Sequence, residues 1–189
     1  MTKQALRKHH KELRMQLTLP QQHVAIAGVL QHLEQLPLPA LQVVLSYKPL
    51  VQQHEFPAAF VEEWLLQRQP GLTIAYPRVL QEQSMLEAVM EGPASQWVTG
   101  AFGIEELEHA DVLLPATIDL VLVPLLAFDT YGHRVGYGKG FYDRYLATCR
   151  PDTLSLGLSW FGPVDEIEDV HLHDIPLKYC ATPSQLYAF

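Results

Sequence analysis

The feature that most constrains this chain is the alternation of short apolar runs with segments of helical periodicity. Strand-like runs occupy residues 41–47, 72–76, 85–90, 119–123, 154–159 and 179–182. Apolar residues at helical spacing predict two helices within residues 1–36 and further helices at 57–69 and 141–149. Strands that alternate with helices are typical of an α/β fold, with a mostly parallel sheet covered on both faces.

Local signals place the second helix more closely than the others. Thr18, Pro20 and Gln21 read as an N-cap, an early helical proline and a capping-box glutamine, so this helix begins near Leu19. Residues 91–115 are rich in Gly and Pro, and the pattern predicts no order of elements there. Since we find neither an internal repeat nor a linker-like change of composition, we predict that residues 1–189 form a single domain.

Composition excludes several other classes of protein. With 48% hydrophobic and 18% charged residues among 189, the chain has the make-up of an ordinary globular domain. Cys149 and Cys180 lack CxxC spacing, which argues against a disulfide framework or a zinc cage. No apolar run approaches the roughly 20 residues that cross a bilayer, so we predict a cytoplasmic protein with no membrane partner.

The distribution of charge points to a small anionic ligand. A net charge of −8 is spread along the chain, which favours solubility and argues against a nucleic-acid partner. Basic residues nevertheless gather at residues 3–14 and 134–144. If these two stretches meet in space, they form a positive pocket suited to a small polyanion.

The segment that carries chemistry is a glycine-rich turn between a strand and a helix. Gly136, Gly138 and Gly140 alternate with other residues after the apolar run at 119–123. Glycine adopts positive φ without steric cost, so successive backbone N–H groups can turn toward one point and bind phosphate. Such a stretch is also typical of a flexible turn, but Lys139 within it favours a phosphate site.

Charged side chains beside the glycines strengthen this interpretation. Arg134 and Arg144 can add charge-assisted contacts to phosphate, and Asp143 in the first helical turn is placed to hold magnesium. The motif is not the G-x-x-x-x-G-K-[ST] loop, because glycine and phenylalanine follow Lys139 where a hydroxyl would be required. The pattern therefore predicts a phosphate-binding loop of another kind.

The same residues resemble a known signature. The run Val123-Pro124, Ala127-Phe128-Asp129, Gly132, Arg134 and Gly136 to Asp143 is similar to that of the 5-formyltetrahydrofolate cyclo-ligase family. Further similarity lies at Lys3 and Arg7, Tyr47 and Glu55, Tyr76-Pro77-Arg78, and Gly103-Ile104. The resemblance implies a three-layer α/β/α fold with a mostly parallel, mixed central sheet, related to the doubly wound nucleotide binders.

The resemblance also implies ligands and the residues that face them. ATP would contact Lys3, Arg7, Arg134, Gly136, Tyr137, Gly138, Lys139, Gly140, Phe141, Tyr142 and Asp143. A reduced folate would contact Tyr47, Glu55, Phe102, Tyr137 and Phe141. Lys139 and Arg134 would act in catalysis by neutralising the transferring phosphoryl group, and Asp143 would hold Mg²⁺.

The implied reaction is the ATP-dependent closure of 5-formyltetrahydrofolate to the 5,10-methenyl form. We separately predict that the protein is a monomer. One departure raises an alternative: Lys178 stands where many family members carry an acid, and Asp174 would have to substitute. A non-catalytic folate- and nucleotide-binding regulatory protein would suit this change. A kinase or ligase acting on another formamide or carboxylate is the remaining alternative.

Other basic side chains are predicted to lie on the surface and to bind neither a metal nor a ligand. The pairs His9-His10 and His171 with His173 lack a third metal ligand at a recognisable spacing, so we predict solvated surfaces there. Lys8, Lys11 and Arg14 are predicted to be exposed helix residues.

Overall fold

A mixed sheet of eight strands forms the middle of the computed structural model, which describes residues 1–189 apart from the side chain of residue 101. Its strands are β1 (Val43–Leu45), β2 (Thr73–Leu80), β3 (Met85–Met90), β6 (Asp111–Leu113), β7 (Leu120–Pro124), β10 (Leu154–Leu158), β11 (Tyr179–Ala181) and β12 (Leu186–Ala188). Their order is β12-β11-β10-β7-β1-β2-β3-β6. The five central neighbours from β11 to β2 are parallel, whereas β12, β3 and β6 pair antiparallel.

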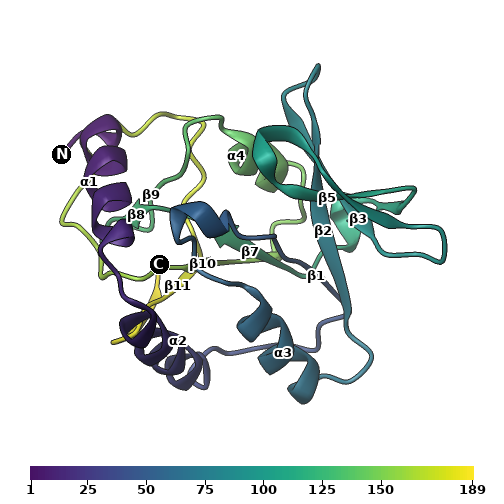
Figure 1. Ribbon diagram of the computed structural model, residues 1–189, viewed down its shortest axis with the longest axis horizontal. Helices are drawn as coiled ribbons and strands as arrows, with labels where there is room; N and C mark the ends of the chain where they lie inside the picture. The colour runs from purple at the N-terminus through teal and green to yellow at the C-terminus, as the bar shows by residue number, and fades with distance from the viewer.

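Helices cover both faces of this sheet, as Figure 1 shows. They are α1 (Lys3–Met15), α2 (Leu19–Leu33), α3 (Ala59–Arg68) and α4 (Phe141–Leu146). The helices α2 and α3 pack on one face, α4 packs on the other, and α1 packs against a small ladder described below. The predicted three-layer α/β/α architecture with a mixed central sheet is therefore confirmed.

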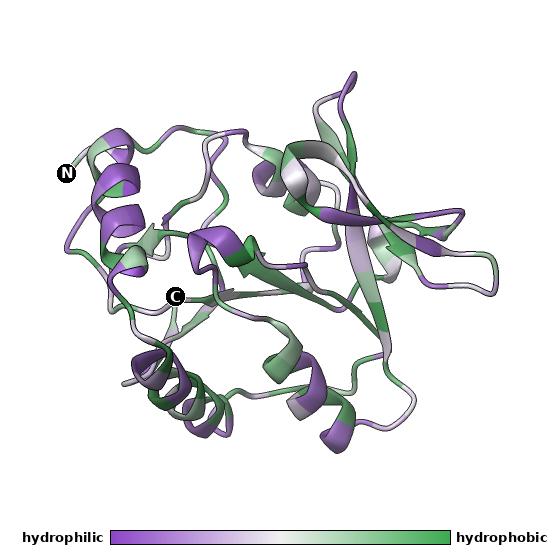
Figure 2. Cartoon of the chain, viewed as in Figure 1, coloured by the Kyte–Doolittle hydropathy of each residue, from purple (hydrophilic) through white to green (hydrophobic). Residues whose placement is uncertain are grey.

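Alternation of side chains along the central strands builds a core on each face. Val44 and Leu122 pack with α2 and α3, whereas their chain neighbours Leu45 and Val121 pack on the face of α4. All four are completely buried, and Figure 2 shows the strands in the middle of the sheet as mainly hydrophobic. Successive residues of a strand point to opposite faces, so a sheet covered on both sides needs apolar residues at every position.

The structure adds two short ladders that the sequence pattern did not predict. One joins β4 (Gln96–Thr99) to β5 (Glu105–Glu108) inside the unassigned segment 91–115, and the other joins β8 (Ala127–Phe128) to β9 (Arg134–Val135). Three 3₁₀ helices complete the described elements: η1 (Val51–Gln53), η2 (Ala101–Gly103) and η3 (Pro115–Thr117). The β8–β9 ladder carries Arg134, for which the sequence pattern predicted no strand.

A buried carboxylate holds the turn between β8 and β9. Asp129 is completely buried, and its Oδ1 accepts hydrogen bonds from the backbone N–H groups of Tyr131 and His133 at 3.0 and 2.9 Å. Its Oδ2 accepts another from the N–H of Ile167 at 3.2 Å. The Ala127-Phe128-Asp129 part of the motif thus has a structural task, because it fixes the strand from which Arg134 projects.

The strand and helix predictions agree with the structure in most cases. The capping box at Thr18 and Gln21 is present, and α2 begins at Leu19 as predicted. All six predicted strands occur, with ends that differ by a few residues. The helix predicted at 141–149 is shorter, ending at Leu146, and β12 was not predicted. None of the helices is long and apolar enough to cross a membrane in the part of the chain that is described.

The strand order reverses direction between β1 and β7, which locates a natural binding cleft. From β1 the chain proceeds outward to β2, whereas β7 leads the other way to β10 and β11. In open α/β sheets, ligands bind where the order reverses, beyond the carboxyl ends of the strands. Tyr47 follows β1, and Pro124 ends β7, so both lie at this edge.

Candidate active site

A cleft of about 710 Å³ lies at this edge of the sheet. Residues that line it come from α1, from the segment after β1, from β2 and β3, and from the stretch 134–144. Every site residue predicted above lies on its wall: Lys3, Arg7, Tyr47, Glu55, Phe102, Arg134, Gly136, Tyr137, Gly138, Lys139, Gly140, Phe141, Tyr142 and Asp143. The two basic stretches of the sequence therefore do meet in space.

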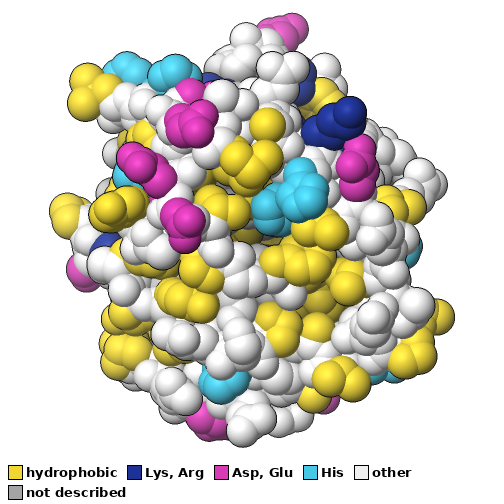
Figure 3. Space-filling model, turned by 90° about the vertical axis from the view of Figure 1, so that its left-hand side faces the viewer, with side chains coloured by type: hydrophobic (Ala, Val, Ile, Leu, Met, Phe, Trp, Pro, Cys, Tyr) yellow, Lys and Arg dark blue, Asp and Glu magenta, His cyan; other side chains and the backbone are white. Residues whose placement is uncertain are grey.

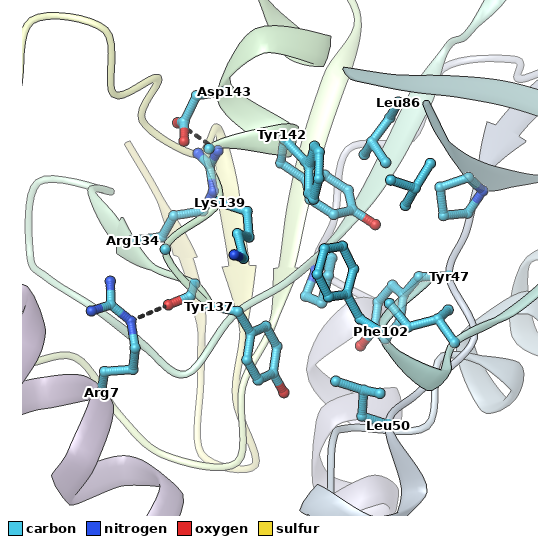
Figure 4. A pocket seen from close by; sticks show the side chains of 18 of the residues that line it. Arg7, Tyr47, Leu50, Leu86, Phe102, Arg134, Tyr137, Lys139, Tyr142 and Asp143 are labelled. Atoms are coloured by element: carbon cyan, nitrogen blue, oxygen red, sulfur yellow. Dashed lines mark hydrogen bonds and ion pairs between the residues drawn. The ribbon is translucent and has the colours of Figure 1, made fainter. Parts of the chain in front are cut away.

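One end of the cleft is cationic. Figure 4 shows Arg7 and Arg134 on one side and Lys139 pointing into the space between them and the aromatic residues. Arg7 donates from Nε to the carbonyl of Gly136 at 2.8 Å. Neither Arg7 nor Lys139 forms an ion pair with any carboxylate among the described side chains. Both charges thus remain available to an anion.

The face that α1 and α2 present to solvent has a different character. Figure 3 looks onto it and shows hydrophobic side chains among scattered carboxylates and histidines, with few basic groups. Leu19 and Val24 of α2 are 69% and 75% exposed. Lys3 and Arg7, four residues apart on one helical face, instead point to the cleft.

The turn at residues 136–140 has two of its three glycines in the left-handed region. Gly138 has φ +89° and Gly140 has φ +67°, whereas Gly136 does not have positive φ. A Cβ at Gly138 would also lie 3.2 Å from the Arg7 guanidinium. The predicted positive φ is therefore confirmed at 138 and 140, where a side chain would be strained, and is wrong for 136.

Acidic groups accompany the deeper cations. Arg134, with a side chain only 6% exposed, donates to Asp143 Oδ1 at 2.7 Å and to the carbonyl of Ile175. Burial lowers the pKa of Arg134, and the nearby Asp143 and Asp174 oppose that change. Asp143 Oδ1 also accepts from the Ile175 N–H at 3.1 Å, while no described protein donor contacts its Oδ2. Asp174 pairs with Lys3.

Two basic residues singled out in the sequence have other contacts here. Arg144 lines the cleft, but its guanidinium donates to the carbonyls of Lys139 and Ser84, both at 2.7 Å, and so braces the glycine turn. Lys178 does not line the cleft, and its Nζ donates to the carbonyl of Pro151 at 2.5 Å. The departure from the family pattern at 178 therefore lies away from the cleft.

The other end of the cleft is aromatic. Phe102 is 57% exposed, and its ring centroid lies 6.1 Å from that of Phe141 and 5.4 Å from Lys139 Nζ. Tyr47 is buried, and its hydroxyl donates to the carbonyl of Phe56 at 2.9 Å. Burial raises the pKa of Tyr142 far above its usual value, so that hydroxyl stays protonated. Flat aromatic faces of this kind suit a planar ring.

A buried carboxylate lies at the aromatic end. Glu55 is 6% exposed; its Oε1 accepts from the Tyr137 hydroxyl at 2.9 Å and its Oε2 accepts from the Leu50 N–H at 2.9 Å. Burial raises the pKa of Glu55, whereas the Leu50 N–H, the charge of Arg14 and the Tyr137 hydroxyl lower it. A buried, hydrogen-bonded carboxylate at a cleft is a functional-site feature.

Two predictions about the first helix are wrong. Arg14 is 1% exposed rather than solvated, and donates from Nη1 to the Tyr137 hydroxyl at 3.2 Å. His10 is 4% exposed, with its ring 5.8 Å from that of Phe161. The spacing of the cations does relate Arg14 to the predicted site residues, because Lys3, Arg7 and Arg14 are separated by four and seven residues and so share one helical face.

Among the described residues, no group of three or more His, Cys, Asp or Glu side chains is arranged to hold a metal.

Lys48 is a cleft residue that the sequence analysis did not predict. It lines the cleft with its Nζ 4.4 Å from the ring centroids of both Tyr76 and Trp97. These aromatic residues come from β2 and β4, and β4 was itself unpredicted. The contact depends on the position of the β4–β5 hairpin, so nothing local in the sequence could have indicated it.

Comparison with known proteins decides the family. The model of the 5-formyltetrahydrofolate cyclo-ligase family matches residues 1–177. The chain belongs to that family. A 5-formyltetrahydrofolate cyclo-ligase from Haemophilus influenzae is 30% identical over 183 residues, which cover 93% of this chain and 94% of that protein. For the cyclo-ligase of Escherichia coli, 38% identity extends over 98 residues, so the match spans about half of each protein, 50% and 54%.

Solved structures agree with this assignment. A 5,10-methenyltetrahydrofolate synthetase from Aquifex aeolicus superposes with a TM-score of 0.77 at 26% identity, over 100% of this chain and 93% of that one. One from Mycoplasma pneumoniae superposes with a TM-score of 0.75 at 24% identity, over 97% and 99%. The fold of this cyclo-ligase family member is therefore the fold of both synthetases.

Proposed function

We propose that this chain converts 5-formyltetrahydrofolate to 5,10-methenyltetrahydrofolate with consumption of ATP and release of ADP and phosphate. The single observation that carries the proposal is the placement of Arg7 and Lys139, two cations without carboxylate partners among the described residues, beside an aromatic-walled slot. The cations suit a triphosphate, and the slot suits a pterin ring. Membership of the cyclo-ligase family supports the same reaction.

The phosphate end would position and neutralise the transferring group. In the proposed first step the formyl oxygen bonds to the γ-phosphorus of ATP as the bond from that phosphorus to ADP breaks. Lys139 and Arg7 bind the phosphate oxygens, and the backbone turn at Gly138 and Gly140 leaves room for their approach. Charge stabilisation of this kind is the main protein contribution to phosphoryl transfer.

Ring closure would follow without a covalent bond to the protein. The second folate nitrogen attacks the activated formyl carbon and loses its proton to solvent, and phosphate departs with the oxygen that belonged to the formyl group. Arg134, braced by Asp143, faces the cleft as a fixed positive charge for that leaving group. No side-chain nucleophile is needed, so the protein acts chiefly by holding the two reactants in line.

Asp143 is the residue that would hold magnesium. One of its oxygens is engaged by Arg134 and the Ile175 N–H, and the other has no described protein partner on the cleft wall. One carboxylate combined with substrate phosphates is a common way for proteins to bind Mg²⁺. When bound, the ion supplies further neutralisation of the phosphate charge.

The aromatic end would bind the folate. Phe102 and Phe141 offer ring faces to the pterin or aminobenzoyl group, and Glu55 accepts hydrogen bonds from pterin N–H groups. Because the Tyr47 hydroxyl is already bonded to the Phe56 carbonyl, Tyr47 contributes its ring rather than its hydroxyl.

The test is turnover with a defined set of substrates. Purified protein supplied with ATP, magnesium and 5-formyltetrahydrofolate should produce the methenyl absorbance, and omission of ATP should abolish it. Folded protein that binds ATP or the folate without releasing phosphate would instead be a regulatory binder. Turnover of other formamides or carboxylates in a parallel panel, but not of the folate, would assign a different ligase. The monomeric state and the cytoplasmic location stay predictions.

A further inference from the structure

Arg14 lies beneath the aromatic end of the cleft without lining it. It is 1% exposed, its Nη1 donates to the Tyr137 hydroxyl at 3.2 Å, and its Nη2 donates to the Leu125 carbonyl. Its Nε has no hydrogen-bond partner among the described residues. Burial of a guanidinium is costly unless an opposite charge lies nearby, so the position calls for a functional or structural reason.

The opposite charge is on Glu55, one hydroxyl away. Tyr137 donates its only hydroxyl proton to Glu55 Oε1 at 2.9 Å, so toward Arg14 the same oxygen can only accept. The two hydrogen bonds therefore run in one direction, with Arg14 donating to Tyr137 and Tyr137 donating to Glu55. With the Leu50 N–H donating to Oε2, both oxygens of Glu55 accept from protein donors, which suits an ionised carboxylate.

We propose that Arg14 is a positioning residue, which orients the Tyr137 hydroxyl and keeps Glu55 ionised so that the carboxylate can accept hydrogen bonds from a ligand in the cleft. The identity of that ligand as a folate rests on the proposed function. The effect of Arg14 on the ionisation of Glu55 is independent of the proposed function.

Other titratable groups around Glu55 do not supply the same charge. Tyr47 and Tyr142 face it, and its negative charge helps to raise the pKa of both, so they remain neutral. His54 is bonded instead to the Arg14 carbonyl at 3.0 Å. Lys11 lies over the Tyr137 ring at 5.2 Å. Arg14 is the one cation whose charge lowers the pKa of Glu55 in the described structure.

The sign of the expected effect follows from these contributions. Burial alone raises the pKa of Glu55, and Arg14 opposes burial. Removal of the guanidinium should therefore raise the pKa further, so that the carboxylate takes up its proton at a higher pH. Loss of a nearby charge typically moves a pKa by about one unit or more, a tenfold change in proton affinity.

The direct test is a titration of Glu55 by carboxyl ¹³C NMR in the ligand-free protein, with its signal assigned by its loss in Glu55→Gln. Arg14→Gln should raise the titration midpoint by about one pH unit. Arg14→Lys should move it less, since the charge stays, and Tyr137→Phe should raise it by an intermediate amount. Lys8→Gln, an exposed change on the same helix, should leave it unchanged.

Activity adds a second readout. In Arg14→Gln the acidic limb of kcat/KM for 5-formyltetrahydrofolate should shift to higher pH by the same amount, while the KM for ATP stays close to that of the wild type. A Glu55 midpoint that is unmoved in folded Arg14→Gln overturns the proposal. If that variant does not fold, an unmoved midpoint in Tyr137→Phe overturns it equally. Absence of turnover in the wild type would reject the proposed function and leave the NMR result to decide the role of Arg14.

Discussion

The two ends of the cleft are built in different ways. At the cationic end, Arg7 and Lys139 have no carboxylate partners among the described residues and surround a turn whose glycines keep side chains out of the way. At the aromatic end, Glu55 and Tyr47 are buried and tied to main-chain groups. The first end keeps charge free for a polyanion, whereas the second is organised before a ligand arrives. Substitutions at the two ends should therefore differ in which kinetic constant they change.

The largest effect is expected at Lys139. Lys139→Ala removes a cation that no described carboxylate neutralises, so it should reduce kcat by about 1000-fold with the fold intact. Steady-state turnover and circular dichroism would measure this. The matched control is Lys178→Ala, which removes a lysine away from the cleft and should leave turnover within about twofold of the wild type. Equal losses in both variants would contradict the assignment of Lys139.

A smaller effect is expected at the glycine turn. Gly138→Ala forces a side chain into a residue with φ +89° and against the Arg7 guanidinium, 3.2 Å away. Strain of about 1–3 kcal/mol should raise the KM for ATP by roughly 5- to 150-fold, with a smaller change in the KM for the folate.

Gly71→Ala is the control that separates the effect of backbone strain from the effect of a position in the cleft. Gly71 has φ +94° but lies outside the cleft, with nothing within 4 Å of an added Cβ. This variant should lose thermal stability and keep the KM for ATP. A normal KM for ATP in Gly138→Ala would show that the turn does not approach the nucleotide.

The aromatic end should respond with the opposite selectivity. Phe102→Ala removes an exposed ring from the slot and should raise the KM for 5-formyltetrahydrofolate about tenfold, as expected from roughly 1.5 kcal/mol of ring contact. The KM for ATP should change little. Phe60→Ala, on α3 and 42% exposed away from the cleft, is the control. An increase confined to the KM for ATP would exchange the roles of the two ends.

The smallest effect concerns the Tyr47 hydroxyl. Tyr47→Phe leaves the ring in place and removes the bond to the Phe56 carbonyl. The free energy of unfolding should fall by about 1 kcal/mol, measured by urea denaturation, while the KM for the folate changes by less than about threefold. A large rise in that KM would mean that the hydroxyl contacts the substrate after all.

Local signals explain which parts of the fold could be predicted. The start of α2 follows from the capping box at Thr18, and the central strands follow from apolar runs that suit a sheet buried on both faces. The two-residue strands β8 and β9 have no such pattern, because the buried carboxylate of Asp129 holds their turn through contacts that include the distant Ile167. Strand β12 lies at the sheet edge, where three residues give little periodicity.

The site divides in the same way. The glycine turn with Lys139 is contiguous, and its chemistry could be read from residue types alone. The role of Arg14 could not be read in this way. The spacing of the cations shows that they share one helical face, but it does not show what that face packs against. Only the placement of Tyr137 beside α1 turns an apparently solvated arginine into a buried one.

One measurement directly tests the central claim, that the γ-phosphoryl group of ATP is transferred to the formyl oxygen of the folate in this cleft. 5-Formyltetrahydrofolate labelled with ¹⁸O in the formyl group would be turned over with ATP and magnesium, and the released phosphate examined by mass spectrometry. Transfer of the label to phosphate, one atom for each methenyl product, is the predicted result. Phosphate that carries oxygen only from ATP and solvent would contradict it.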